Sequence, residues 1–280
     1  MKIIKNSSIE GKHKKPIVTD VFYHPNDTPK PIVIFCHGYK GFKDWGAWNL
    51  MAKGIANAGF FFIKFNFSHN GGTLEQPIDF PDLEAFGNNN YTKELDDLES
   101  VMDWICQNSE FKTNSNTNNI TLIGHSRGSG IVTIKAEEDP RVTKVISLAG
   151  VCHYDKRSST IGRLEQWKKD GVKYVMNGRT KQQMPHYYQF YEDFIANKER
   201  LTIKRAVSNL KIPYLIIHGD KDTSILLEEA IQLHSWNKTS KFEIIENADH
   251  VFNARHPWVK TAMPEPLKNV TALIINFIKQ

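Results

Sequence analysis

Short apolar runs alternate with longer helical patterns along most of the chain. Residues 31–36 form a continuous apolar run, which is typical of a strand buried on both faces. In residues 46–58 the apolar side chains recur at the spacing of an amphipathic helix. Further strands are predicted at 3–9, 17–23, 60–67, 120–123, 142–149, 213–218 and 241–245, and further helices at 91–107, from 126 onward, at 225–233 and at 270–278. This order predicts an α/β fold with a mostly parallel central sheet flanked by helices.

Two stretches interrupt the alternation. Residues 68–90 hold many Asn, Gly and Pro residues without a period, so they are predicted to form a long loop. Residues 152–209 contain Lys and Arg clusters, aromatic patches and two helix-like segments. We interpret them as a helical cap or lid inserted into a core made of residues 1–151 and 210–280.

Composition and charge narrow the class of protein. Of the 280 residues 40% are hydrophobic, which is enough for a packed core. The net charge of +5 comes without a basic stripe interleaved with aromatic residues, so no nucleic-acid partner is expected. The N-terminal residues lack the apolar stretch of a signal peptide, and no apolar run has the length of a membrane span. A cytoplasmic protein without a membrane partner is therefore expected.

The three cysteines give no sign of a metal or disulfide framework. Their number is odd, they are widely spaced, and they form no CxxC pair. The sequence also lacks the HExxH spacing of zinc sites and the glycine patterns that bind dinucleotides or phosphates. We therefore expect neither a metal nor a cofactor.

A candidate nucleophile follows the predicted strand at 120–123. The sequence there is Gly124-His125-Ser126-Arg127-Gly128, the pattern G-x-S-x-G between a strand and a helix. Small residues two positions before and after the serine allow a tight turn that exposes its hydroxyl at the helix N-terminus. A serine that only caps the helix is the simpler alternative, but the strand before and the helix after it favour a nucleophile.

A serine hydroxyl needs a base, and the base needs a carboxylate to orient it. His250 lies in the loop after the last predicted strand. We prefer it to His256 because it lies closer to the end of that strand. Asp222 follows the strand at 213–218. We prefer it to Asp220, which fits a local turn role. Ser126, Asp222 and His250 therefore form the predicted catalytic triad, in the chain order of α/β-hydrolases.

Acyl transfer also needs donors for the oxyanion. The backbone N–H of Arg127, directly after the nucleophile, is the first predicted donor of an oxyanion hole. The second is expected in the loop after the strand at 31–36, which reads His37-Gly-Tyr-Lys-Gly-Phe42. Gly38 allows this loop to fold back, so the N–H of Tyr39 is the predicted donor; a plain turn is the alternative.

These motifs resemble the α/β-hydrolase superfamily over nearly the whole chain. The loop at residues 37–44 and the ending at residues 248–258 resemble dienelactone-hydrolase-like and acyl-peptidase-like serine hydrolases, and are similar to cinnamoyl or feruloyl esterases. Dienelactone hydrolases use a cysteine nucleophile where this chain has Ser126, which favours an esterase. The resemblance implies the α/β-hydrolase fold and the triad, and leaves the substrate open.

The predicted activity is that of a serine esterase acting on a small-molecule ester or a short acyl-peptide. An acyl-peptide or aminopeptidase-type peptidase, or a non-catalytic ligand receptor of the same fold, is the alternative.

Arg157 and Arg163 are either carboxylate binders or surface charges. A monomer and a homodimer are both compatible with the sequence. The candidate substrate-binding residues are His69, in the loop after residue 67, and His186, Tyr187 and Tyr188, in the inserted segment.

Overall fold

The computed structural model describes residues 1–26, 28–157 and 159–280. Within them, an eight-stranded sheet has the order β1-β2-β4-β3-β5-β6-β9-β10. Strands β1 and β2 are antiparallel to each other, and β2 is antiparallel to β4, whereas all later neighbours are parallel. The expected mostly parallel sheet is therefore confirmed. The bounds are β1 Lys2–Glu10, β2 Pro16–Tyr23, β3 Lys30–Cys36, β4 Phe61–Asn66, β5 Ser115–His125, β6 Val142–Leu148, β9 Tyr214–Gly219 and β10 Lys241–Ile245.

The continuous apolar run of β3 is explained by burial on both faces of the sheet. Ile32 and Ile34 belong to the hydrophobic core on one face, and Val33 and Phe35 belong to the core on the other. Successive side chains of a strand point to opposite faces, so a strand covered on both sides must be apolar throughout.

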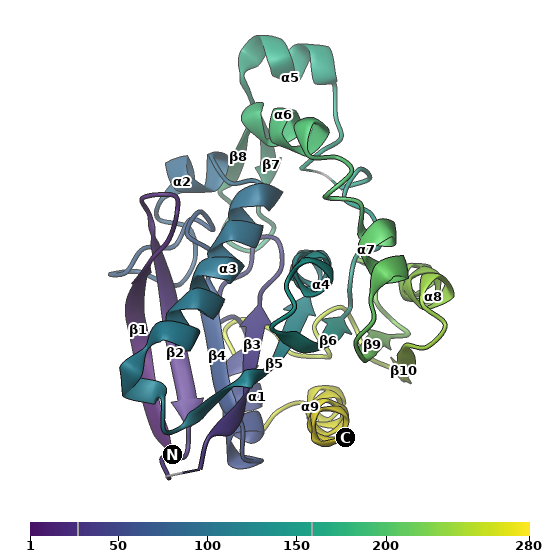
Figure 1. The fold of residues 1–280 in the computed structure, drawn as a ribbon. Coiled ribbons are helices and arrows are strands. Elements are labelled where there is room, and N and C mark those ends of the chain that lie inside the picture. Colours follow the sequence, from purple (N-terminus) through teal and green to yellow (C-terminus); the bar gives the residue numbers. More distant parts are fainter. Residues whose placement is uncertain (27, 158) are drawn as a thin grey trace.

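Helices cover both faces (Figure 1). Helices α1 (Trp48–Asn57) and α9 (Glu265–Lys279) pack against each other on one face. Helices α3 (Tyr91–Gln107), α4 (Arg127–Glu138) and α8 (Leu227–Trp236) contribute to the core on the other. The predicted helix at 91–107 has the observed bounds of α3, while β5 is much longer than the predicted strand at 120–123.

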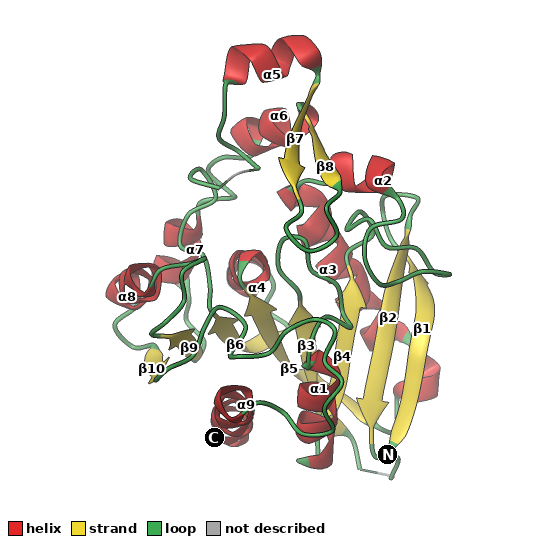
Figure 2. Cartoon of the chain, turned by 180° about the vertical axis from the view of Figure 1, so that it is seen from behind, coloured by secondary structure: helices red, strands yellow, loops and turns green. Residues whose placement is uncertain are grey.

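The inserted segment contains more than helices. It forms α5 (Leu164–Asp170), an antiparallel hairpin of β7 (Val172–Met176) and β8 (Gln183–Tyr187), α6 (Gln189–Ala196) and α7 (Ile203–Asn209). Ser158 lies outside the described residues. The hairpin, α5 and α6 project beyond the sheet, whereas α7 packs on α4 and α8 (Figures 1 and 2). Sequence patterns missed the hairpin because each of its strands has only five residues and neither alternates between buried and exposed positions over its length.

The predicted loop at 68–90 also holds a helix. Helix α2 (Leu83–Gly87) lies within it and packs against β8 of the inserted segment. Its five residues are too few for a helical period to be visible. A 3₁₀ turn, η1 (Ser109–Phe111), precedes β5.

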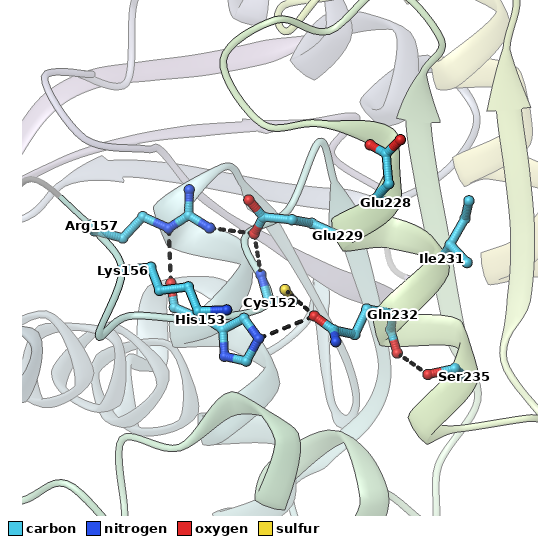
Figure 3. Close-up of a pocket in the computed structure, with 9 residues that line it drawn as sticks. All are labelled: Cys152, His153, Lys156, Arg157, Glu228, Glu229, Ile231, Gln232 and Ser235. Carbon is cyan, nitrogen blue, oxygen red and sulfur yellow. Dashed lines mark hydrogen bonds and ion pairs between the residues drawn. The ribbon is translucent and has the colours of Figure 1, made fainter.

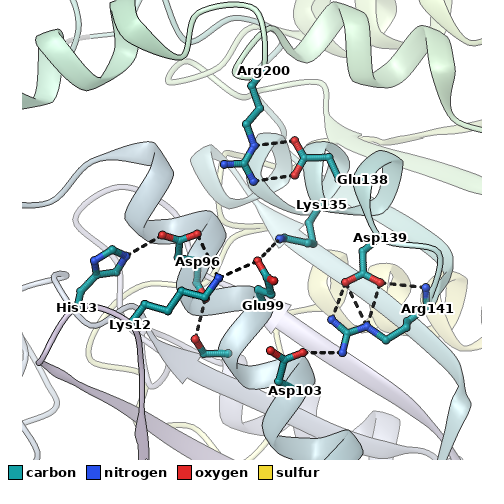
Figure 4. Close-up of polar contacts among 11 residues, drawn as sticks. Lys12, His13, Asp96, Glu99, Asp103, Lys135, Glu138, Asp139, Arg141 and Arg200 are labelled. Carbon is teal, nitrogen blue, oxygen red and sulfur yellow. Dashed lines mark hydrogen bonds and ion pairs between the residues drawn. The ribbon is translucent and has the colours of Figure 1, made fainter.

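Surface ion pairs join the N-terminal hairpin to the helical layer (Figure 4). His13 Nε2 lies 2.9 Å from Asp96 Oδ2, and Lys12 Nζ lies 3.2 Å from Glu99 Oε2, both carboxylates belonging to α3. Glu99 also accepts from Lys135 of α4 at 3.1 Å. The turn between β1 and β2 is thereby tied to two helices.

Candidate active site

Ser126 occupies a strained turn between β5 and α4. Its φ of 55° and ψ of −117° lie in a region that residues with a side chain seldom adopt. The glycines on either side are required by close packing. A Cβ on Gly124 would lie 2.3 Å from Gly128 O, and one on Gly128 would lie 2.5 Å from His37 O. The turn therefore has the geometry that the G-x-S-x-G pattern predicts.

His250 and Asp222, 28 residues apart in the chain, meet at the carboxyl edge of the sheet. His250 Nδ1 lies 2.7 Å from Asp222 Oδ2, so Nδ1 donates and Nε2 is left to accept a proton. The other carboxylate oxygen accepts from the N–H groups of Ser224 and Ile225 at 2.8 and 2.9 Å. Burial raises the pKa of Asp222, but contacts with His218 and His250 outweigh it and hold the pKa well below its usual range.

The alternatives to His250 and Asp222, namely His256 and Asp220, make other contacts. His256 Nδ1 accepts from the Gly46 N–H at 3.0 Å, and its ring packs edge-on against Phe42. The backbone N–H of Asp220 donates to Ile245 O. The contact with His250 is thus made by Asp222.

His125, inside the G-x-S-x-G sequence, supports the histidine loop. Its Nε2 donates to the carbonyl of His250 at 2.8 Å, and the two rings lie 4.8 Å apart. Burial, followed by the neighbouring His250, lowers the pKa of His125 to about 3, so the ring stays neutral and one nitrogen keeps its proton for this bond. Sequence reasoning missed this role because 125 residues separate the partners.

Ser126 and His250 line one cavity of about 140 Å³. The aromatic residues Trp45, Trp48 and Tyr39 also line it, and its wall is largely apolar. The remaining lining residues are His37, Gly38, Lys40, Gly41, His125 and Val251.

The loop after β3 presents one peptide group in a fixed orientation. Gly38 O accepts from Gly41 N–H at 3.0 Å and from His37 Nδ1 at 2.9 Å. Phe67 N–H donates to His37 Nε2 at 3.4 Å, which leaves Nδ1 as the protonated nitrogen. The N–H of Tyr39 belongs to the same trans peptide as Gly38 O and therefore points the opposite way.

Ser126 lies close to this peptide. A Cβ on Gly38 would approach Ser126 Cβ to 2.9 Å, so only glycine lets the two backbones come this near. The second predicted donor, the N–H of Arg127, is the first of helix α4 and has no carbonyl to bind within the helix.

A buried ionic network anchors the end of the same loop. Lys43 and Lys64 are fully buried, and each contacts both Asp20 and Asp44. The distance from Asp20 to each lysine is 2.7 Å. Burial lowers the pKa of Lys64, but the adjacent carboxylates oppose this. These four paired charges, with the more exposed Lys5 beside both carboxylates, thus fix the chain at Lys43 and Asp44, the end of the loop.

The Arg127 side chain is buried beneath the inserted segment. Its Nη1 lies 3.2 Å from Glu94 Oε1 of α3, and its guanidinium lies 4.4 Å from the centre of the Tyr39 ring. Phe190 of α6 is a further neighbour, at 5.5 Å. The Arg127 side chain therefore connects the helical layer with the loop of residues 37–44, which we call the Tyr39 loop.

The structure places the four candidate substrate-binding residues outside the set that lines the cavity. His69 Nδ1 lies 2.8 Å from Ser68 Oγ. His186 shares a hydrogen bond with Tyr39. The Tyr187 hydroxyl donates to Glu84 of α2, and Tyr188 packs edge-on against Trp167. Of these four residues, His186 is the one hydrogen-bonded to a residue of the cavity wall, Tyr39.

A second, more open cleft lies between the start of the inserted segment and α8 (Figure 3). Arg157 lines it and forms an ion pair with Glu229, which also accepts from the N–H of Cys152 at 2.8 Å. Gln232 accepts from Cys152 Sγ at 3.1 Å. These bonds fasten the segment to α8, and the guanidinium of Arg157 is engaged within the protein.

Within ranges 1–26, 28–157 and 159–280, no group of three or more His, Cys, Asp or Glu side chains is arranged to hold a metal ion. None of the helices in the same ranges combines the length and apolar character of a membrane span.

Comparisons with known proteins agree with this architecture. A family model described as alpha/beta hydrolase fold matches residues 31–168. The chain has the α/β-hydrolase fold. Est1E from Butyrivibrio proteoclasticus is 15% identical with a TM-score of 0.72, covering 99% of this chain and 98% of its own. The esterase domain of a Rhodothermus marinus protein is 16% identical with a TM-score of 0.66, at 99% and 98% coverage.

A third solved structure has a similar fold. Dienelactone hydrolase from Anabaena variabilis is 16% identical, covers 99% of this chain and 97% of its own, and has a TM-score of 0.65. Est1E has also been solved with ferulic acid bound. A comparison with curated proteins gives no match.

Proposed function

We propose that this α/β-hydrolase-fold protein is a serine hydrolase that cleaves a carboxylic ester through an acyl-enzyme. The observation that carries the proposal is the cavity lined by both Ser126 and His250, with His250 bonded to Asp222. A serine at a strained turn, a histidine with a free Nε2 and a buried carboxylate are the parts that acyl transfer needs.

The chemistry follows from the positions of these groups. Ser126 Oγ attacks the ester carbonyl while His250 Nε2 takes its proton, and Asp222 stabilises the imidazolium. The N–H groups of Tyr39 and Arg127 hold the negative oxygen of the tetrahedral intermediate. His250 then gives the proton to the leaving alcohol oxygen. Water, activated by the same histidine, releases the acid and restores the serine.

The cavity wall supports a choice of acyl group. Trp45, Trp48 and Tyr39 provide flat apolar surfaces next to Ser126, and the space is about 140 Å³. Such a site suits a short or planar acyl group better than a long flexible chain. The ferulic acid found in the structure of Est1E, a protein of the same fold, supports testing aromatic acids.

A substrate panel tests the proposal. It consists of p-nitrophenyl esters of rising acyl length, methyl ferulate and aminoacyl anilides, each assayed with the wild type and with Ser126→Ala. We expect hydrolysis of short or aromatic esters that falls by at least about a thousand-fold in the variant. Cleavage of the anilides without cleavage of the esters would show that the protein is a peptidase and not an esterase. Equal ester hydrolysis by both proteins would overturn the proposal.

A further inference from the structure

The hairpin β7–β8 of the inserted segment is bonded to the loop that carries a proposed oxyanion donor. The Tyr39 hydroxyl and His186 Nε2 of β8 lie 2.7 Å apart, and their rings are 5.6 Å apart with a tilt of 37°. The next residue, Lys40, donates from Nζ to the carbonyl of Met176 in β7 at 3.0 Å. Two consecutive loop residues are thus held by the two strands of one hairpin.

His186 is well placed to hold a partner still. The residue is 1% exposed, and its ring lies 5.6 Å from the Phe86 ring and 6.0 Å from the Phe190 ring. Its carbonyl accepts from Trp167 Nε1 at 2.8 Å, which joins β8 to α5. Burial, then the charge of Arg127, lowers the pKa of His186 to about 3, so its ring is neutral at ordinary pH.

The Tyr39 side chain lies between His186 and Arg127, the residue that carries the other proposed oxyanion donor. One face of the ring lies against the Arg127 guanidinium, and its hydroxyl meets His186. The backbone N–H groups of Tyr39 and Arg127 are the two proposed donors. Hydrogen bonds to a developing oxyanion are effective only when the donors are placed to within a fraction of an ångström. A bond that holds the Tyr39 side chain therefore adds to the bonds at Gly38 O, which orient the same peptide and its N–H.

We infer that His186 is a positioning residue of the active site, acting through the Tyr39 hydroxyl to hold the Tyr39 N–H in place for the oxyanion. The inserted segment is then part of the catalytic apparatus as well as a cover. The inference rests on the proposed function, because it assigns a role within the same acyl-transfer site.

The experiment removes the bond from each side. Tyr39→Phe deletes only the hydroxyl, and His186→Phe removes the ring nitrogen that meets it. We expect each variant to lower kcat about ten-fold, less than the loss of a whole oxyanion donor, with KM changed less than two-fold. The double variant should be no slower than either single variant. His186→Gln, which keeps a polar group near Nε2, should recover most of kcat.

A control and a second measurement separate positioning from general stability. Gln182→Ala deletes another bond from the inserted segment to the core, from Gln182 Nε2 to Phe80 O at 3.0 Å, without touching the Tyr39 loop. It should keep the kcat of the wild type. Affinity for an alkyl boronic acid, which forms a tetrahedral adduct with the serine, should fall with kcat, whereas affinity for the product acid should not.

Several results would overturn the positioning role of His186. An unchanged kcat in Tyr39→Phe, additive losses in the double variant, or an equal loss in Gln182→Ala would overturn the inference. A rise of KM alone would also overturn it, in favour of substrate binding. Should His186→Phe fail to fold, Tyr39→Phe gives the answer. Absence of Ser126-dependent hydrolysis in the wild type overturns the proposed function and this inference together, while unaltered Ser126-dependent activity in Tyr39→Phe overturns the inference alone.

Discussion

The Ser126 turn (residues 124–128) and the Tyr39 loop (residues 37–44) line the same cavity, and different forces hold them. The turn is held by its own backbone, because Gly124 and Gly128 pack so closely that a Cβ on either would clash with a carbonyl oxygen. The loop is held from a distance, by buried charges on β2 and β4 and by the hairpin of the inserted segment. Local sterics thus place the proposed nucleophile, and tertiary contacts place its proposed electrostatic partner.

The largest expected effect is the loss of activity when the carboxylate that orients His250 is replaced. Asp222→Asn keeps an oxygen for the N–H groups of Ser224 and Ile225, but turns a donor toward His250 Nδ1. The imidazole would then hold its proton on the wrong nitrogen. We expect kcat to fall about ten-thousand-fold with a nearly normal circular dichroism spectrum. A variant with more than a tenth of wild-type activity would remove Asp222 from the mechanism.

The next effect tests the anchoring of the Tyr39 loop. Asp20→Asn removes a fully buried carboxylate that contacts Lys43 and Lys64, leaving two buried ammonium groups with Asp44 as their shared partner. Breaking a buried ion pair costs about 3–5 kcal/mol of unfolding free energy. Urea unfolding should show this loss, and kcat should also fall because the loop shifts. A stability change below about 1 kcal/mol would show that the network does not anchor the loop.

An effect that is smaller for each pH unit, and is shared by both sides of the cavity, is a dependence of stability on pH. Burial lowers the pKa of His125, in the turn, to about 3 and that of His37, in the loop, to about 4. An unfolded histidine has a pKa of about 6.5, so between pH 6.5 and 4 the unfolded chain binds more protons than the folded one. The unfolding free energy should therefore fall as pH drops through this range, by about 1.4 kcal/mol per pH unit for each histidine. Urea unfolding at pH 7.5, 6 and 5 measures it, and a constant or rising stability would contradict the assignment of buried neutral rings.

The smallest effect is expected at a partly exposed ion pair, which serves as the control for Asp20. Arg200 and Glu138 form two bonds of 2.8 Å between the inserted segment and α4, with their side chains 35% and 23% exposed (Figure 4). Water screens such pairs, so Glu138→Gln should cost only roughly 0.2–1 kcal/mol and leave kcat unchanged. A loss as large as that of Asp20→Asn would mean that burial does not distinguish the two networks.

The comparison also explains what the sequence could predict. The Ser126 turn follows from residues adjacent in the chain, since a strand, two glycines and a helix start define it. Asp222 and His250 follow strands of the sheet, and parallel topology brings strand ends to one edge. The alternation of apolar runs and helical patterns similarly predicted the sheet and the helices on its two faces.

The residues that support the site could not be predicted in this way. The bond between Tyr39 and His186 joins positions 147 residues apart, and the contact of His125 with the His250 carbonyl spans 125. Lys43 and Lys64 look like surface lysines in the sequence, because only the fold brings Asp20 and Asp44 to them. The hairpin of the inserted segment was missed for a related reason, since its short strands pair only with each other.

Covalent labelling gives the most direct test of the Ser126–His250–Asp222 site. The protein is treated with a fluorophosphonate, digested, and the modified peptide is located by mass spectrometry. A working Ser126–His250–Asp222 site predicts one phosphonate per chain, on Ser126, with no adduct in Ser126→Ala and much slower labelling in Asp222→Asn. An unlabelled wild type, beside a known serine hydrolase that is labelled under the same conditions, or an adduct on another residue, would contradict the claim.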